Sequence, residues 1–253
     1  MGGGTLQKPG IRLLGGTAFE AIGTTVPVLI PTTLSAAHRY SRAGLVNYRV
    51  ARWVVPAGLV GTVLGAVSSR LVPGEGHLLQ VATALLLGYA AVRMIVPARP
   101  GVAEIAVDPE TGPSMLGVTR PRRTTGTAAS GPRLAILGIV AGASGGLLGI
   151  GGGVVLVPAL HRIARLPLKN AIATSILAVG FFAVPNTITH GLLGNIHWRL
   201  ALLLAIGVVP GAWLGANVVV KAKNRAVTRA TGLVLLVVAG LYGASEILSL
   251  NSL

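Results

Sequence analysis

A cluster of glycines inside an apolar run is the feature of this sequence that points most directly to chemistry. Gly149, Gly151, Gly152 and Gly153 lie in the uncharged stretch 134–160. Glycine adopts backbone conformations that other residues resist, so this cluster predicts a break in a helix. The helix N-terminus at such a break concentrates N–H groups and partial positive charge, which attract an anion without a lysine. We therefore predict that these glycines bind substrate, with close helix packing as the alternative. For the isolated glycines, packing is the prediction: Gly61, Gly65, Gly211 and Gly215.

Polar side chains within otherwise apolar runs are further candidates for substrate contact. Thr24 and Thr25 lie in one run, and Thr174 and Ser175 lie in another. Their hydroxyl groups can donate to substrate oxygens, although hydroxyls in membrane helices often bond to carbonyls of their own helix. Asn186 lies deeper in the second run, where an amide needs a partner. We predict substrate binding by all five residues and keep structural hydrogen bonding as the alternative.

Two titratable residues near apolar runs are candidates for proton coupling. His190 changes charge near neutral pH, and Glu20 is an acid at the edge of a spanning run. The alternatives are a position in the lipid headgroup region for His190 and a favourable first-turn helix charge for Glu20. The five histidines lack the spacing of a metal site, and cysteine is absent. The sequence therefore predicts no metal and no cofactor.

Composition predicts an integral membrane protein of the all-α class. The chain is 52% hydrophobic and 11% charged, whereas soluble domains have about 25% charged residues. The net charge of +15 gathers at the ends of apolar runs, which indicates membrane topology rather than nucleic-acid binding. The expected partners are the lipid bilayer and a small anion. Uncharged runs close to spanning length occur at 21–37, 53–69, 76–92, 171–198, 200–220 and 230–245.

An internal repeat becomes visible when residue n is compared with residue n + 150. Three blocks correspond in order: AIGTT at 21–25 with AIATS at 171–175, GLVNYR at 44–49 with GNIHWR at 194–199, and GTVLGA at 61–66 with GAWLGA at 211–216. Ordered blocks of this kind indicate two related halves. We predict a first repeat at 1–96, a second repeat at 133–253 and a cytoplasmic linker at 97–132, whose Pro, Gly and Thr content is typical of a loop.

The distribution of basic residues favours inverted halves. If 134–163 crossed the membrane once, the basic clusters would divide almost evenly between the two sides. If this segment enters and returns, nearly all of the positive charge lies on one side, as in cytoplasmic loops. The two arms, 134–148 and 152–163, are each expected to be too short to span. We predict that each half consists of a glycine-broken hairpin followed by three transmembrane helices.

The first half begins in the middle of its expected hairpin. GGGTLQKP, directly after Met1, corresponds to GGGVVLVP in the second half, so the first arm of that hairpin is missing. Either this half is naturally shortened, or translation starts upstream. We favour the upstream start.

These motifs resemble the sulfite exporter TauE/SafE family of membrane permeases. The resemblance covers nearly the whole chain and depends most on GLLGIGGGVVLVPAL, LPLKNAIATS and NTITHGLLGNIHWR. The first half departs from the pattern by its missing arm and by Lys8, where the second half has Val157 or Pro158. The resemblance implies transport of small anions such as sulfite, organosulfonates or carboxylates, coupled to the proton gradient.

The predicted function is a secondary transporter that crosses the inner cell membrane several times. The sequence leaves a homo-oligomer open. The alternative is a non-transporting membrane protein with an assembly or scaffold role. We do not predict an enzyme, because the sequence has no nucleophile elbow and no His-Glu metal signature. GIGGG also lacks the preceding strand and the later acid of a dinucleotide-binding loop.

Overall fold

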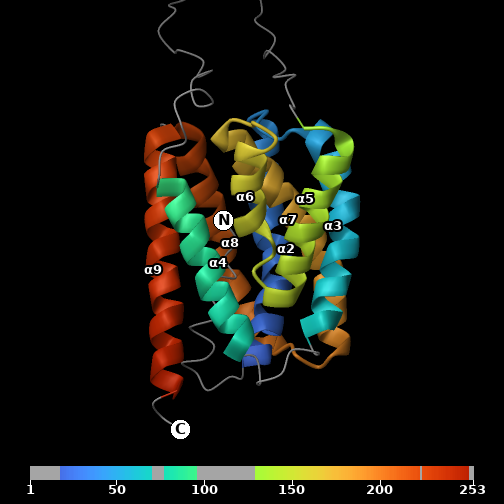
Figure 1. Ribbon diagram of the computed structural model, residues 1–253, viewed down its shortest axis with the longest axis vertical. Helices are drawn as coiled ribbons and strands as arrows, with labels where there is room; N and C mark the ends of the chain where they lie inside the picture. The colour runs from blue at the N-terminus through green and yellow to red at the C-terminus, as the bar shows by residue number, and fades with distance from the viewer. Residues whose placement is uncertain (1–17, 70–76, 96–128, 223, 251–253) are drawn as a thin grey trace, which may run out of the picture.

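The computed structural model describes residues 18–69, 77–95, 129–222 and 224–250. The regular structure in these ranges is helical, and no strand occurs in them, which confirms the predicted all-α class. Figure 1 shows the helices as a bundle of roughly aligned rods. The helices are α2 (Ala18–Arg42), α3 (Tyr48–Ser68), α4 (His77–Ile95), α5 (Gly131–Leu148), α6 (Gly153–Arg162), α7 (Leu168–Leu192), α8 (Trp198–Lys221) and α9 (Asn224–Leu250).

Four of the described helices are long and apolar enough to cross a membrane by length and composition: α3, α5, α7 and α8. The expectation that both hairpin arms are too short is wrong for α5. This helix has 18 residues, or about 27 Å, close to the roughly 30 Å hydrocarbon core. It begins at Gly131, within the last residues of the predicted linker, and most of that linker lies outside the described residues.

A seam of small residues joins α3 to α5, which lie side by side in Figure 1. A Cβ atom added at Gly61 would lie closer than 3.0 Å to the carbonyl oxygen of Ile139, and one at Gly65 would lie equally close to that of Ala143. Only glycine lets the two backbones approach this closely. The predicted packing role is therefore confirmed for Gly61 and Gly65.

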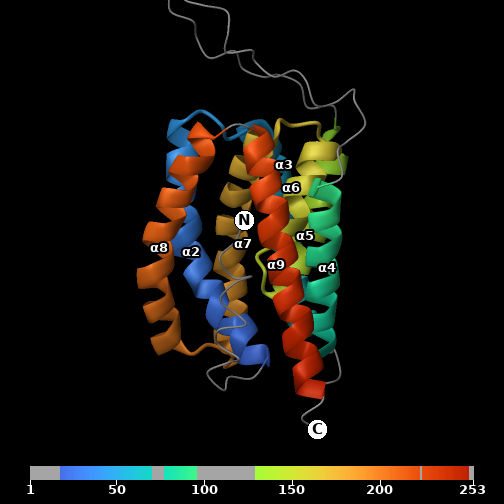
Figure 2. The same ribbon diagram turned by 90° about the vertical axis from the view of Figure 1, so that its left-hand side faces the viewer.

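The two central helices, α2 and α7, run in opposite directions. The start of α7 contacts the loop before α3, whereas the start of α2 contacts the loop before α8. Both helices are 25 residues long, and their bounds differ by 150 positions at each end. Figure 2 shows α2 with α8 on one side of the bundle and α4 with α9 on the other. Inverted halves require that the equivalent helices α2 and α7 run in opposite directions, although the inverted repeat itself stays a prediction.

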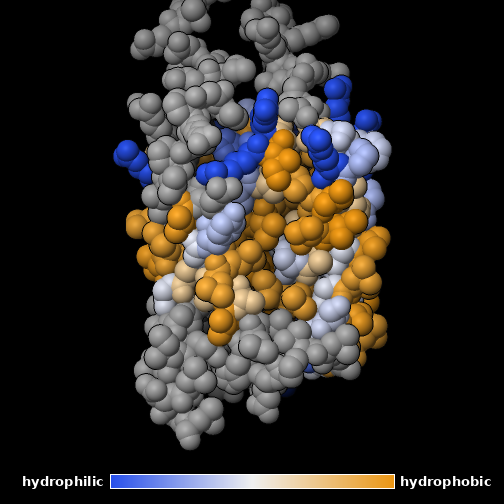
Figure 3. All heavy atoms as spheres, viewed as in Figure 1, coloured by the Kyte–Doolittle hydropathy of each residue, from blue (hydrophilic) through white to orange (hydrophobic). Residues whose placement is uncertain are grey.

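Most basic side chains of the described residues gather at one end of the bundle, where α2, α6 and α8 end and α3, α5 and α7 begin. Arg199, in the first turn of α8, lies at the other end. Blue, hydrophilic residues lie at the basic end in Figure 3, above sides that are largely orange and hydrophobic. Lys169 donates to the carbonyl of Val220 at 2.9 Å, and Arg39 donates to Asn217. These bonds tie the start of α7 and the end of α2 to the last turns of α8. The charged end is the one that positive-inside topology places in the cytoplasm.

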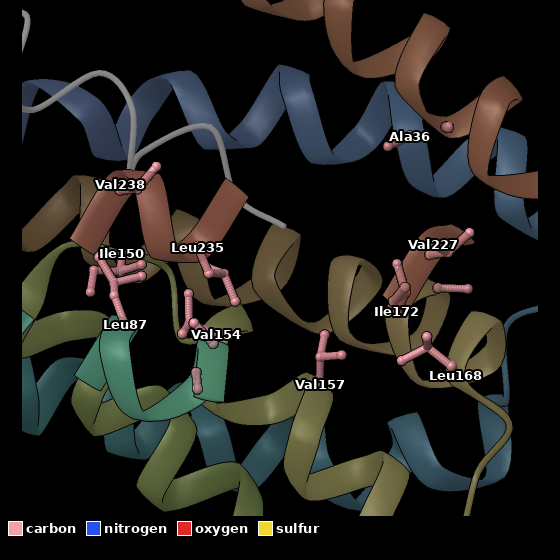
Figure 4. Packing of buried hydrophobic residues seen from close by; sticks show 14 of the residues in the cluster. Ala36, Leu87, Ile150, Val154, Val157, Leu168, Ile172, Val227, Leu235 and Val238 are labelled. Carbon is pink, nitrogen blue, oxygen red and sulfur yellow. The ribbon is translucent and has the colours of Figure 1, made fainter. Parts of the chain in front are cut away.

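The turn between α5 and α6 is anchored in an apolar cluster. Ile150 is buried and packs with Leu87 of α4 and Val238 of α9, as the close view in Figure 4 shows. Val154, at the start of α6, belongs to the same cluster. Packing on several helices fixes where the turn lies in the bundle, and therefore where α6 begins.

Candidate functional site

The glycine cluster forms the predicted helix break. Gly149, Gly151 and Gly152 have φ values of 62°, 78° and 73°, in the left-handed region that favours glycine. α5 ends at Leu148, and α6 begins at Gly153 without a side-chain cap at its N-terminus. The break predicted from the sequence is confirmed.

The hairpin turn fits tightly against its surroundings. A Cβ atom at Gly152 would lie closer than 3.0 Å to the carbonyl oxygen of Ala141, and one at Gly145 would lie 2.6 Å from the backbone nitrogen of Gly152. One at Gly149 would lie 2.5 Å from Ile22 Cγ2 of α2. The start of α6 therefore lies level with the second half of α5. With 10 residues, or about 15 Å, α6 spans half of the hydrocarbon core.

The N-terminus of α6 faces an unpaired hydroxyl on α7. A Cβ atom at Gly153 would lie 3.6 Å from Ser175 Oγ and 3.3 Å from Val179 Cγ2. Ser175 is 1% exposed, and its hydroxyl has no hydrogen-bond partner among the described residues. Thr25 occupies the corresponding position on α2, but it donates to the carbonyl of Ile22 at 2.9 Å. A buried hydroxyl without a partner costs about 1–3 kcal/mol, so Ser175 is a donor in need of an acceptor.

The backbone of α6 supplies further donors at the same point. Its ladder of helical bonds begins with the N–H of Leu156 donating to the carbonyl of Gly152 at 3.0 Å. The N–H groups of Gly153, Val154 and Val155 precede that bond, so they have no acceptor within the helix. Together with Ser175, they form a set of hydrogen-bond donors suited to an oxyanion.

Asn186 contacts the hairpin on α5, before the turn. It is 1% exposed, its amide nitrogen lies 3.5 Å from the carbonyl oxygen of Gly145, and its Oδ1 has no partner among the described residues. Asn186 and Ser175 are 11 positions apart on α7 (186 − 175), so they share a face but lie about 16 Å apart along the axis. In this conformation a small anion cannot touch both residues, and only Ser175 adjoins the N-terminus of α6.

Thr24 and Thr174 each accept a hydrogen bond from a loop that joins two helices. Thr174 Oγ1 accepts from the N–H of Asn47 at 2.9 Å, and Thr24 Oγ1 accepts from the N–H of His197 at 3.0 Å. The two bonds are equivalent under the 150-residue offset, and they lie at opposite ends of the bundle. Each fastens a central helix to the loop between two helices of the other half. Substrate contact by Thr24, Thr25 and Thr174 stays a prediction.

Of the two candidate proton carriers, His190 is the one whose side chain the structure describes. His190 is fully buried, one helical turn beyond Asn186, and its Nδ1 lies 3.5 Å from the side-chain nitrogen of Asn195. It therefore lies inside the protein rather than on a lipid-facing surface. Glu20 lies in the first turn of α2, but its side chain is outside the described part of the structure. The part of the chain that is described holds no group of three potential metal ligands.

Two asparagines that organise this region are not among the residues predicted from the sequence. Asn47 bonds to Thr174 and also accepts from the N–H of Val50 at 3.2 Å, which caps α3. Asn170 donates to the carbonyl of Leu45 at 2.9 Å. The signal that could have found Asn47 is the repeat, because the blocks GLVNYR and GNIHWR align it with His197.

The helices and the hairpin define a multi-pass membrane protein with a glycine-broken element held between two central helices. Its family is shown by comparison with known proteins. The chain belongs to the sulfite exporter TauE/SafE family, whose family model matches residues 1–242.

Curated relatives of the chain are named as probable membrane transporter proteins. YunE of Bacillus subtilis is 26% identical over 262 residues, which cover 98% of this chain and 90% of YunE. MamO of Magnetospirillum gryphiswaldense is 32% identical over 234 residues, or 85% of this chain and 37% of MamO. MamO of Paramagnetospirillum magneticum is 29% identical, with 36% of its length covered. The chain thus spans little more than a third of either MamO protein. No solved structure gives a significant match.

Proposed function

We propose that this chain is a secondary transporter of small anions and that it binds them at the N-terminus of α6. The family and the names of the relatives support transport across a membrane. The observation that carries the anion site is Ser175, a buried hydroxyl without a partner in the described structure, facing the uncapped start of a helix. The class of substrate is a sulfite-like or organosulfonate anion, with small carboxylates as the next candidates.

Physical chemistry favours this site for an anion of moderate charge. A helix N-terminus carries roughly half a positive charge, and the N–H groups of α6 and the hydroxyl of Ser175 can bond to several oxygens at once. An ion buried without such bonds would lose its hydration energy, and the apolar interior of the bilayer would not compensate for that loss. Because no lysine or arginine is needed, the anion is held weakly enough to leave, as a carrier requires.

The site is closed in this conformation. A Cβ atom at Gly151 would lie 2.8 Å from Val179 Cγ1 and 2.9 Å from Leu29 Cδ1, so α7 and α2 both pack directly on the turn. Leu29 and Val179 are equivalent under the 150-residue offset. We infer that access to either side of the membrane opens when the hairpin separates from one central helix, as in carriers with inverted repeats.

In this proposal the protein lies in the inner cell membrane with the basic end of the bundle facing the cytoplasm. His190 is the proposed proton carrier, because it is buried one turn from Asn186, which contacts the hairpin at Gly145. Glu20 is the second candidate.

Transport is tested by uptake of radiolabelled sulfite into proteoliposomes with an imposed pH gradient. We expect Ser175→Ala to reduce uptake at least tenfold and to leave folding intact, since it removes an unpaired buried hydroxyl. Ser144→Ala is the matched control, because the Ser144 hydroxyl is already bonded to the carbonyl of Ala141 at 3.0 Å. Competition by unlabelled sulfonates and carboxylates then ranks the substrates.

Two results would count against the proposal. Normal uptake by Ser175→Ala would remove the site at α6. Absence of uptake for every anion tested, with folded wild-type protein in the vesicles, would favour the assembly or scaffold role instead.

A further inference from the structure

Asn186 places a buried amide oxygen beside the last turn of α5. Its side chain is 1% exposed, and its Oδ1 has no hydrogen-bond partner among the described residues. Its amide nitrogen lies 3.5 Å from the carbonyl oxygen of Gly145, which is long for a hydrogen bond. Because an amide oxygen can only accept, the side chain brings to α5 an acceptor that needs a donor or a cation.

Packing alone does not account for an amide at this position. Under the 150-residue offset, Asn186 corresponds to Ala36 of α2, which is also buried, at 6% exposed. A central helix can therefore fill this position with a methyl group. Buried polar atoms in folded proteins are nearly always paired, so the unpaired oxygen of Asn186 indicates a ligand.

The end of α5 supplies further oxygen atoms at the same place. The helix ends at Leu148, and its cap residue Gly149 is left-handed. The carbonyl groups of a last helical turn have no donor within the helix, and a helix C-terminus carries roughly half a negative charge. Gly145 and Gly146 of this turn are buried. The negative end of α5 therefore lies inside the protein, next to Asn186.

The spacing of these oxygens suits a small monovalent cation. A half-turn of the Asn186 amide exchanges Nδ2 for Oδ1, which places Oδ1 at the same 3.5 Å from the Gly145 oxygen. An ion of the size of Na⁺ or Ca²⁺ binds oxygen at about 2.4 Å, so two ligand oxygens at right angles lie roughly 3.4 Å apart. The ligands are neutral, and the described side chains include no carboxylate, which favours Na⁺ over a divalent ion.

We propose that Na⁺ binds between the C-terminus of α5 and Oδ1 of Asn186. The hairpin then offers opposite poles to two ions, with carbonyl groups of α5 for the cation and N–H groups of α6 for the anion. Broken membrane helices bind ions at both kinds of end. The Na⁺ site uses different atoms from the anion site, so it does not depend on the identity of the anion or on proton transfer at His190.

Thermal unfolding of the purified chain in detergent tests this site without transport. NaCl is compared with choline chloride at equal ionic strength and without sulfite, so the two solutions differ only in the cation. At about ten times its dissociation constant, Na⁺ should raise the unfolding temperature by roughly 3–6 °C. Equal unfolding temperatures would mean that water pairs with Asn186, and would overturn the proposal. Failure of the proposed transport function would leave this result unchanged.

Variants of Asn186 identify the ligand atom. Asn186→Ala removes the oxygen and should weaken Na⁺ binding at least about tenfold, as expected for a lost bond to a charged group. Asn170→Ala, on the same helix, is the matched control, because the Asn170 amide donates to the carbonyl of Leu45; its Na⁺ response should be that of the wild type. Asn186→Asp keeps an oxygen without the amide nitrogen and should retain the response.

The aspartate variant also decides the case in which Asn186→Ala does not fold. If the amide only supports the structure through its N–H group, Asn186→Asp would lose that contact and gain no Na⁺ response. Loss of the response in folded Asn186→Asp, or an unchanged Na⁺ affinity in Asn186→Ala, would refute Asn186 as a ligand.

Discussion

Gly153→Ala separates binding at the hairpin from folding more cleanly than a change at any other glycine of the turn. Gly153 is helical rather than left-handed, so alanine is tolerated by the backbone. Its methyl group would lie 3.3 Å from Val179 Cγ2, a side-chain atom that can move by a few tenths of an ångström. It would also lie 3.6 Å from Ser175 Oγ, in the space where the proposed anion bonds to the hydroxyl and the helix N-terminus.

The expected magnitudes differ for stability and transport. Alanine is favoured over glycine in a helix by about 0.5–1 kcal/mol, which offsets the close contact with Val179, so we expect stability to change by less than about 1 kcal/mol. Loss of two hydrogen bonds to a charged ligand, at about 1.5 kcal/mol each, should weaken anion binding by about a hundredfold.

The assay combines thermal unfolding of the purified protein in detergent with sulfite uptake at several concentrations in proteoliposomes. We expect an unchanged unfolding temperature together with a large rise in the concentration that gives half-maximal uptake. Unchanged uptake would show that the anion does not occupy this space. Loss of folded protein would show that Gly153 is required for packing and would refute the expected tolerance of alanine at this position.

Four other substitutions test contacts of the described residues. Gly152→Ala should lower stability by about 1–3 kcal/mol, since it places a side chain in the left-handed region and against the carbonyl of Ala141; denaturant titration measures the loss, and wild-type stability would contradict the strain. Gly61→Leu should prevent α3 from packing on α5 and sharply reduce the yield of monodisperse protein, whereas full yield would mean that the seam is dispensable. Thr24→Val and Thr174→Val should each lower the free energy of unfolding by about 1 kcal/mol. The double variant should lower it by the sum of the two losses, because the two bonds lie at opposite ends of the bundle. Unequal losses in the single variants would show that the two bonds are not equivalent.

The sequence predicts those features that have a local cause. The break at Gly149–Gly153 could be predicted because three of these residues need a backbone region that only glycine occupies easily. The predicted start of the first arm at 134 is later than the observed start of α5 at Gly131, because the predicted linker includes Pro132, although proline is tolerated in the first turn of a helix.

Contacts between distant segments could not be predicted in the same way. Thr24 and Thr25 are neighbours of the same type, yet one hydroxyl bonds to a loop 173 residues away and the other bonds to its own helix. Ser175 and Thr25 occupy equivalent positions, but only the serine lacks a partner in the described structure. These differences depend on tertiary packing, which no local pattern encodes.

The bond between Thr24 and His197 has a consequence for how the protein is made. Its two residues are 173 positions apart, so at about 5–20 residues per second a ribosome needs roughly 10–35 s to deliver the second after the first. During that interval α2 is already synthesised, but its neighbour α8 does not yet exist. Slow translation, or a stop between the two halves, would therefore leave a polar and incompletely packed helix exposed to membrane quality-control proteases. The yield of folded protein should therefore depend on how soon the second half follows the first, as well as on the stability of the finished bundle.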